Sequence, residues 1–204
     1  QAHMRYRIWA SKAEKENFPT VARLFNCTSD AEQVHATLHF NALKDVNGDF
    51  PVVSMAGFGL GTTSENLVGA IGGETFEFTQ MYPAYIAVAE LQGEKAAISA
   101  MRFAIEAEKV HAELFTQAKE AVDAGKDLDA AVILLCPVCG FISLTGDEAE
   151  CPICRANKTC ATTVPGNVRR CPPSATNRQS DDYHKRRHCG FLPGLFLIPD
   201  VCAL

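Results

Sequence analysis

The chain has 204 residues, of which 47% are hydrophobic, and it carries a formal net charge of −5. This length allows one sizeable core and a small appended unit. The acidic balance, without a basic stripe, argues against a nucleic-acid partner. No apolar run reaches the roughly 18 residues that a membrane helix needs, so we expect a cytoplasmic protein with no membrane partner.

Two helices are predicted in the first part of the chain. Apolar residues recur at helical spacing over residues 1–17, and Asn17-Phe18-Pro19 interrupts this pattern. Pro19 is well placed to begin a second helix, which we expect to run to about Leu43. Because the chain starts at Gln1, inside a helical pattern, we expect a fragment whose N-terminal segment is missing.

A long connection and a third helix follow. Residues 44–63 are rich in Gly, Asp and Val and are too long for a tight turn. We expect Ser64 to cap a third helix that runs to about Leu91. Pro83 lies inside this helix and predicts a kink, because an interior proline removes a backbone hydrogen bond.

The fourth predicted helix completes a bundle. Gln92-Gly93 ends the third helix, and the fourth runs to about Ala124 before Gly125. The connections are therefore short, long and short. This order is typical of a ferritin-like four-helix bundle, so the predicted fold is mainly α, with the bundle over residues 1–126.

One motif occurs on both the second and the fourth predicted helix. Residues 31–38 read AEQVHATL and residues 107–114 read AEKVHAEL. Helical residues three apart share a face, so Glu32 lies beside His35 and Glu108 beside His111. A lone pair of this kind is usually an ordinary surface pair. Here Val and Leu flank both pairs, and a carboxylate and an imidazole on an inward face are costly unless paired or metal-bound. Two such pairs therefore suggest one shared site.

The third predicted helix adds Glu74 and Glu77, in the segment GGETFEFTQMYP. A Glu from each of two helices, with Glu-x-x-His from each of two others, is the ligand set of di-iron and di-manganese bundles. Carboxylates can bridge two metals, and imidazole suits iron. A plain set does not need Glu77, whose alternative interpretation is a solvated helix acid. The repeat also places a first-helix carboxylate just before Gln1, so we expect one ligand to be missing.

Four cysteines form a second candidate metal site. Cys136, Cys139, Cys151 and Cys154 stand in two C-x-x-C pairs, CPVCG and CPIC. In a chain without secretory features, such pairs indicate a metal site more often than two disulfides. Tetrahedral thiolate sulfur holds iron or zinc alike. We therefore predict a small four-cysteine metal domain over residues 131–158.

Taken together, GGETFEFTQMYP, the two A-E-x-V-H-A motifs, SENL at 64–67 and the cysteine pairs resemble rubrerythrin. The resemblance covers residues 1 to about 158. It implies a di-iron bundle followed by a rubredoxin-like iron domain. The implied activity is a peroxidase that reduces hydrogen peroxide to water. Electrons would come from NAD(P)H through a separate reductase or rubredoxin, and the protein would be a homodimer.

The resemblance also implies roles for individual residues. The di-iron ligands would be Glu32, His35, Glu74, Glu77, Glu108 and His111. Glu32 and Glu108 would bridge the irons, and one iron would exchange Glu77 for His35 on reduction. Tyr6 and Tyr82 match tyrosines that hydrogen-bond the carboxylates, although plain core packing explains them equally well. The expected catalytic residues are Glu32, His35, Glu77, Tyr82 and Glu108.

Three features depart from the family pattern. The family has Gly-Glu-Ser before the Gln-Ala that opens this chain, and that Glu is a ligand. Arg155 follows the second cysteine pair, where a Gly would more easily adopt a positive φ. Residues 159–204 turn basic without clear periodicity, and we expect a disordered segment of non-native origin. An alternative for this tail is a further metal site with His184, His188 and Cys189.

Two other functions stay open at this stage. One is a ferritin-like iron-binding or storage protein, and the other is an inactive fragment. Storage requires neither Glu77 nor a four-cysteine domain, which favours the peroxidase. There is no G-x-G-x-x-G in a β-α context, so we do not expect the chain to bind the nicotinamide itself.

Overall fold

The computed structural model describes residues 1–49, 56–157, 163–164 and 167–168. All of the described residues belong to one compact unit, which spans residues 1–172. The expectations for the tail therefore fall almost entirely outside the described ranges. Among the described residues, no helix combines the length and apolarity needed to cross a membrane.

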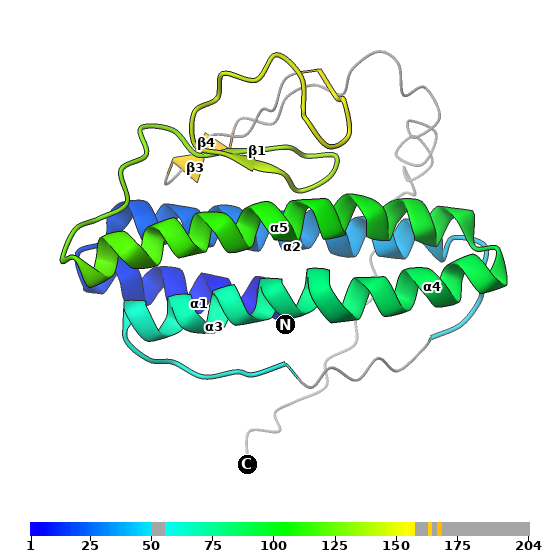
Figure 1. Cartoon of the computed structure of the whole chain (residues 1–204), viewed down its shortest axis with the longest axis horizontal. Coiled ribbons are helices and arrows are strands. Elements are labelled where there is room, and N and C mark those ends of the chain that lie inside the picture. The colour runs from blue at the N-terminus through cyan, green and yellow to red at the C-terminus, as the bar shows by residue number, and fades with distance from the viewer. Residues whose placement is uncertain (50–55, 158–162, 165–166, 169–204) are drawn as a thin grey trace, which may run out of the picture. The chain divides into compact units, whose positions relative to one another are not determined.

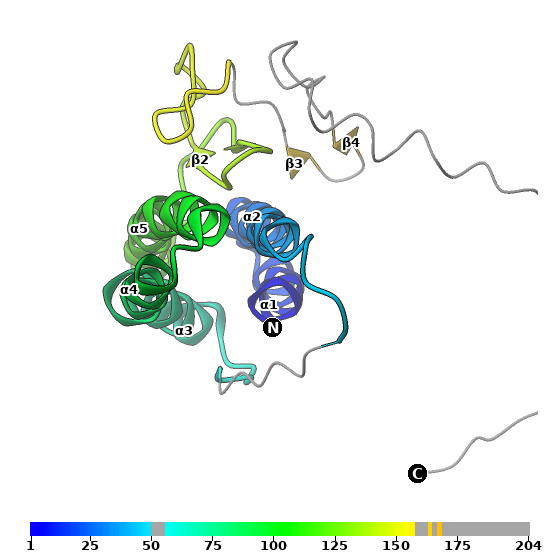
Figure 2. The same ribbon diagram turned by 90° about the vertical axis from the view of Figure 1, so that its right-hand side faces the viewer.

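The helices form a four-helix bundle (Figures 1 and 2). They are α1 (Ala2–Lys15), α2 (Pro19–Ala42), α3 (Thr63–Phe76), the π-helical turn η1 (Glu77–Met81), α4 (Tyr82–Gln92) and α5 (Lys95–Asp123). In the end view of Figure 2, α1, α2, α5 and the continuous run α3–η1–α4 surround one centre. The mainly α fold with one long crossover is therefore confirmed.

Aromatic side chains fill one part of the bundle core. Tyr6 and Trp9 of α1, Phe25 of α2 and Phe115 of α5 are all buried. Their contacting ring centroids lie between 5.2 and 6.0 Å apart. Aromatic pairs at these separations add to the hydrophobic stabilisation. Cys27 is fully buried in the same cluster.

The third helix begins two residues earlier than predicted. Thr62, and not Ser64, is its N-cap, and Thr62 and Glu65 form a reciprocal capping box. The segment Thr-x-x-Glu matches this motif, in which side chain and backbone bond to each other at both ends. The Ser64 hydroxyl instead donates a hydrogen bond to Asp123 of α5. The prediction that Ser64 caps the helix was wrong because the capping box satisfies the helix end better.

The irregularity expected at Pro83 is a π-helical turn. In η1 the backbone N–H of Tyr82 bonds to the carbonyl of Glu77, five residues earlier. Proline has no N–H, so the bond from residue 83 to residue 79 cannot form in any helix. The wider turn ends just before Pro83, which therefore stands in the first turn of α4, where its missing N–H costs least. Such turns are frequent at functional sites, and this one begins at a predicted ligand, Glu77.

Glu16 joins the end of α1 to the start of α3. Its carboxylate accepts hydrogen bonds from the backbone N–H of Thr63 at 2.7 Å and from the Thr63 hydroxyl at 2.6 Å. Lys12 Nζ lies 2.8 Å from the other oxygen. The bonds from Lys12 and Thr63 lower the pKa of Glu16 to about 2. The ionised form is therefore the one that stabilises the fold.

Glu16→Gln should lower the free energy of unfolding at pH 7 by about 1 kcal/mol, because the amide accepts these bonds more weakly. The pKa of Glu16 is lowered by folding, so its stabilisation is complete above the unfolded value near 4.5 and disappears as pH falls towards 2. Urea unfolding at pH 7 and pH 3 measures both differences. Glu14→Gln, an exposed change on the same helix, is the control. An equal deficit at both pH values would contradict this assignment.

The cysteine-rich segment follows α5 and contains short strands. β1 (Leu134–Leu135) pairs antiparallel with β2 (Ile142–Ser143), so that Leu135 faces Ile142. An isolated bridge joins Glu150 and Asn157. β3 (Thr163–Val164) and β4 (Asn167–Val168) form a second antiparallel pair. The β1–β2 hairpin brings the first C-x-x-C pair against the bundle.

Candidate metal centres

All six predicted di-iron ligands meet inside the bundle. They are Glu32 and His35 on α2, Glu74 on α3, Glu77 on η1, and Glu108 and His111 on α5. Their donor atoms form three groups, each within 4.8 Å: Glu32–His35–Glu108, Glu74–Glu108–His111 and Glu32–Glu74–Glu77–Glu108. Glu108 belongs to all three groups, and Glu32 to two of them. This is the arrangement that two metals with shared ligands require.

Several donor atoms in this cluster have no hydrogen-bond partner although they are buried. They are Glu32 Oε1, His35 Nδ1, Glu74 Oε2 and Glu108 Oε1. His35 Nδ1 lies 2.8 Å from Glu108 Oε1, but the two are not aligned as a hydrogen bond. Unsatisfied buried polar atoms are costly and uncommon. Their convergence fits a site whose partners are metal ions.

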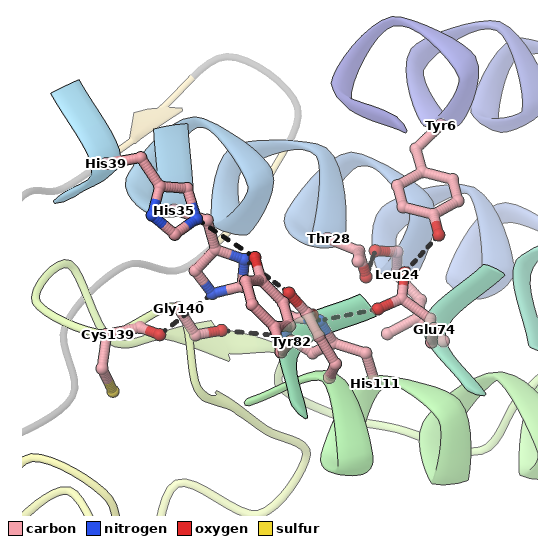
Figure 3. Close-up of polar contacts among 11 residues, drawn as sticks. Tyr6, Leu24, Thr28, His35, His39, Glu74, Tyr82, His111, Cys139 and Gly140 are labelled. Atoms are coloured by element: carbon pink, nitrogen blue, oxygen red, sulfur yellow. Dashed lines mark hydrogen bonds and ion pairs between the residues drawn. The ribbon is translucent and has the colours of Figure 1, made fainter. Parts of the chain in front are cut away.

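Backbone carbonyls of the first cysteine pair orient both imidazoles (Figure 3). His35 Nε2 lies 3.1 Å from the carbonyl oxygen of Cys139, and His111 Nε2 lies 2.9 Å from that of Gly140. A carbonyl can only accept, so each Nε2 carries the proton and donates it. The Nδ1 atoms face the carboxylates and are the ring nitrogens left to bind a metal.

The carboxylates strongly perturb one another. Burial, followed by repulsion from Glu108, raises the pKa of Glu74 to about 7 and that of Glu77 to about 9. Burial and Glu108 likewise raise the pKa of Glu32. Burial alone would raise the pKa of Glu108 too, but the two imidazoles hold it well below its ordinary value. A dense group of acids like this is stabilised by bound cations.

Two tyrosines border the cluster. The phenol of Tyr6 donates a hydrogen bond to Glu74 across the core. The hydroxyl oxygen of Tyr82 lies 3.2 Å from His39 Nε2. This hydrogen bond joins Tyr82 to an imidazole and not to a carboxylate. Burial and then Glu108 raise the pKa of the Tyr82 phenol, which therefore stays protonated. Sequence reasoning missed His39, although its place four residues after His35 puts both on one face of α2.

The four cysteines form a second, separate cluster. Cys136 Sγ lies 3.6 Å from Cys154 Sγ, and Cys139 Sγ lies 3.5 Å from Cys151 Sγ. All four Sγ atoms lie within 4.8 Å of one another as reduced thiols. A tetrahedral metal with bonds of about 2.3 Å would hold its sulfurs about 3.8 Å apart. A hydrogen bond from Cys139 lowers the pKa of Cys136 to about 5, which favours the thiolate. The geometry fits a metal site and not two disulfides.

The glycine of the first pair and the arginine of the second are explained by their surroundings. Gly140 has a φ of 83°, and a Cβ there would lie 2.3 Å from His35 Nε2. Arg155 also has a positive φ, 60°, but its side chain is exposed and pairs with Glu150. The first pair therefore requires glycine for its contact with the bundle. The second tolerates a side chain at the cost of backbone strain.

Comparisons with known proteins agree with this geometry. The family model Rubrerythrin matches residues 1–119. Rubrerythrin-2 of Clostridium acetobutylicum is 45% identical over 157 residues, which cover 77% of this chain and 85% of that protein. Nigerythrin of Nitratidesulfovibrio vulgaris is 33% identical over 153 residues, covering 75% and 74%. The match begins at residue 1, and the expectation that an N-terminal segment is missing stays a prediction.

Solved structures show the same fold. A structure of nigerythrin in its fully reduced, all-ferrous state superposes with a TM-score of 0.69 at 32% identity, covering 77% of this chain and 76% of that one. A partially reduced state gives 0.68 at 32% identity, with 76% of each chain covered. With a ferritin-like bundle, a buried carboxylate–imidazole cluster and a rubredoxin-like four-cysteine site, this chain belongs to the rubrerythrin family.

Proposed function

We propose that this chain is a non-haem di-iron peroxidase that reduces hydrogen peroxide to water. The observation that carries the proposal is the direct contact between the two clusters. Both ligand imidazoles donate hydrogen bonds to the backbone of the first cysteine pair, at Cys139 and Gly140. A storage protein needs no such connection, whereas a reductase needs a path for electrons into its catalytic site.

The donor set is suited to iron at both sites. Glu32, His35, Glu74, Glu77, Glu108 and His111 would hold two ions, and Cys136, Cys139, Cys151 and Cys154 one more. Carboxylate and imidazole suit iron, while four thiolates would hold iron or zinc alike. When bound, the iron pair supplies the two electrons that cleavage of an O–O bond consumes. The thiolate site has no open position, so its role is electron relay.

The surrounding residues control access and protons. A cavity of about 400 Å³ reaches Glu32, His35 and Glu77, and is also lined by His39 and Tyr82. This volume admits peroxide with several waters. The protonated Tyr82 phenol can donate a hydrogen bond to a peroxide oxygen, and His39 holds that phenol at the cavity wall. The backbone carbonyls of Cys139 and Gly140 keep both imidazoles in the tautomer with the proton on Nε2.

The electron source lies outside this chain. We assign it to an NAD(P)H-dependent reductase or a rubredoxin that reduces the four-cysteine site. The family likeness also supports a homodimer. Neither assignment changes the chemistry at the buried cluster.

The function is tested by combining metal analysis with turnover. If the chain is a peroxidase, the two clusters together should hold about three irons per chain. NADH oxidation should then depend on both the reductase and peroxide. A storage protein would take up many more ferrous ions in air without such turnover. About one iron per chain and no activity would identify an inactive bundle. Either of the last two results would overturn the proposal.

Glu77→Ala should weaken ferric binding at one position at least about tenfold more than ferrous binding. The groups Glu32–His35–Glu108 and Glu32–Glu74–Glu77–Glu108 share two carboxylates, so His35 can serve the same ion when Glu77 does not. Iron titration in each oxidation state measures the difference, with the exposed Glu106→Ala as the control. If structures of the oxidised and reduced protein show the same ligand, Glu77 or His35, on this iron in both states, the proposed exchange is contradicted.

A further inference from the structure

A second, larger cavity lies beside the bundle and has no part in the mechanism above. It measures about 1160 Å³ and is lined by the crossover residues 56–61 together with α1, α3, η1 and α4. Its apolar walls include Phe58, Leu60, Phe76, Met81, Ala84 and Tyr85. Small-molecule sites typically measure about 300–1,000 Å³ and have mostly apolar walls with a few polar groups. We call this cavity the side groove.

The side groove adjoins the cavity at the carboxylate cluster. Arg5, Ala56, Glu77, Met81 and Tyr85 line both cavities. The smaller cavity reaches Glu32 and His35 directly. A molecule that lies in the side groove can therefore extend one end towards the candidate metal ligands at Glu77.

A polar group with an unused donor lies where the two cavities meet. Arg5 is only 6% exposed, and its Nη1 donates a hydrogen bond of 2.8 Å to the carbonyl of Gly57. Its guanidinium carbon lies 5.2 Å from the ring centre of Trp9 and 5.5 Å from that of Tyr6. Its Nε is buried and has no hydrogen-bond partner. A buried donor without an acceptor favours a ligand that brings an oxygen atom.

We propose that the side groove binds the organic part of an alkyl hydroperoxide, so that the cluster reduces organic hydroperoxides as well as hydrogen peroxide. This inference rests on the proposed peroxidase function and names a further substrate class for it. The apolar walls contact the hydrocarbon, and the guanidinium of Arg5, which lines both cavities, donates a hydrogen bond to the oxygen attached to carbon. Arg5 and Glu65 both line the groove and offset each other's charge, so the groove has no excess positive charge that would favour an anion such as a fatty-acid carboxylate. The ligand is therefore neutral.

The reaction balances as ROOH plus two electrons and two protons giving ROH and H₂O. The O–O bond breaks, the oxygen attached to carbon leaves as the alcohol, and the other oxygen leaves as water. The electrons come from the reduced cluster of the proposed function, and the protons come from solvent. The alcohol product keeps both the hydrocarbon and the oxygen that Arg5 would bind, so it is a stable probe of the groove.

Trp9 makes binding visible without any turnover. It is the only tryptophan of the chain, and it lines the side groove. Its indole N–H donates a hydrogen bond of 2.8 Å to the carbonyl of Gly59, in the groove wall. A ligand in the groove should therefore change the emission of this one residue.

The experiment titrates the as-isolated protein with 2-phenyl-2-propanol, the alcohol formed from cumene hydroperoxide, and follows Trp9 emission. A saturable change is expected. Ala84→Phe, at an exposed position in the groove wall, should weaken binding about tenfold or more, the effect of changing the volume of an apolar pocket. Ala87→Phe adds the same side chain to the same helix, outside the groove lining, and should bind as the parent protein does.

Steady-state kinetics give the second readout. The ratio of kcat/KM for cumene hydroperoxide to kcat/KM for hydrogen peroxide should fall about tenfold in Ala84→Phe and stay unchanged in Ala87→Phe. Gly57→Leu is an independent variant, because a Cβ at Gly57 meets no atom within 4 Å and the residue lines the groove. It should lower the ratio in the same direction.

The outcomes separate this inference from the proposed function. Reduction of hydrogen peroxide without saturable alcohol binding, or with a ratio that neither variant changes, overturns the side-groove assignment alone. Saturable binding without reduction of any peroxide overturns the peroxidase, and the substrate assignment with it. If Ala84→Phe separates subunits in size-exclusion chromatography while alcohol binding is unchanged, the groove is a contact between copies and the inference is wrong.

Discussion

Replacing Cys136 with serine should stop steady-state peroxide reduction driven by NADH and a reductase. A serine hydroxyl does not substitute for a thiolate, so the four-sulfur set that Cys136 shares with Cys139, Cys151 and Cys154 is broken. We expect the steady-state rate of peroxide reduction to fall at least about a hundredfold. Changing a residue that only supports a metal ligand already costs up to about a hundredfold in activity, and Cys136 is itself a candidate ligand. Stopped-flow and steady-state assays of the same preparation measure the effect.

The same variant should still consume one equivalent of peroxide when its buried cluster has been reduced chemically. In the proposed function the four-cysteine site would relay electrons, and the O–O bond would be cleaved at the carboxylate cluster. Cys27→Ala is the control, because it removes a buried thiol from the bundle core and leaves the four-cysteine site intact. Steady-state turnover that survives in Cys136→Ser would show that electrons reach the cluster by another route.

Glu108→Gln should remove most metal from the buried cluster while leaving the four-cysteine site loaded. Glu108 is fully buried and belongs to all three groups of donor atoms. Its two oxygens lie 2.8 Å from His35 Nδ1 and 2.8 Å from His111 Nδ1. The amide has the same shape but no charge, so both metal positions lose their common anionic ligand. Iron should fall from about three to about one per chain.

Plasma mass spectrometry measures this loss, and visible absorption of the thiolate site shows that the remaining metal is bound to cysteine. Glu106→Gln is the matched control on α5, because Glu106 is exposed and its ion pair with Lys109, at 2.7 Å, lies on the protein surface. His35→Asn should reduce occupancy less than Glu108→Gln, since His35 belongs to only one group. Equal iron content in Glu108→Gln and the parent would refute the role of a shared ligand.

The helices and the ligand pairs could be predicted because their determinants are local. Pro19 and Gly93 end or begin helices by what they do to their own backbone. The predicted boundaries of the second and fourth helices agree with α2 and α5 within two residues. The spacing Glu-x-x-His puts both side chains on one face of any helix, whatever surrounds it. Element types and paired residues therefore follow from the order of amino acids alone.

The choice between competing local hydrogen bonds was harder to predict. Thr62 and Ser64 are both good capping residues, and only the reciprocal bond with Glu65 decides between them. Proline at 83 indicated an irregular helix, but not that the irregularity would be a π-turn that begins at Glu77. Each of these outcomes depends on small differences between alternative hydrogen bonds, which the surrounding packing selects.

The sequence by itself determined the family, the bundle and the two sets of candidate metal ligands, because these depend on helical periodicity and on short spacings. Only the tertiary structure decided how the two sets meet. The bond between His35 and Cys139 joins residues 104 positions apart, and the close approach of Gly140 to His35 has no local signal. The side groove with Arg5 at its inner end likewise forms between α1, the crossover and α4. Contacts between distant segments depend on how whole elements pack, which no short stretch of sequence encodes.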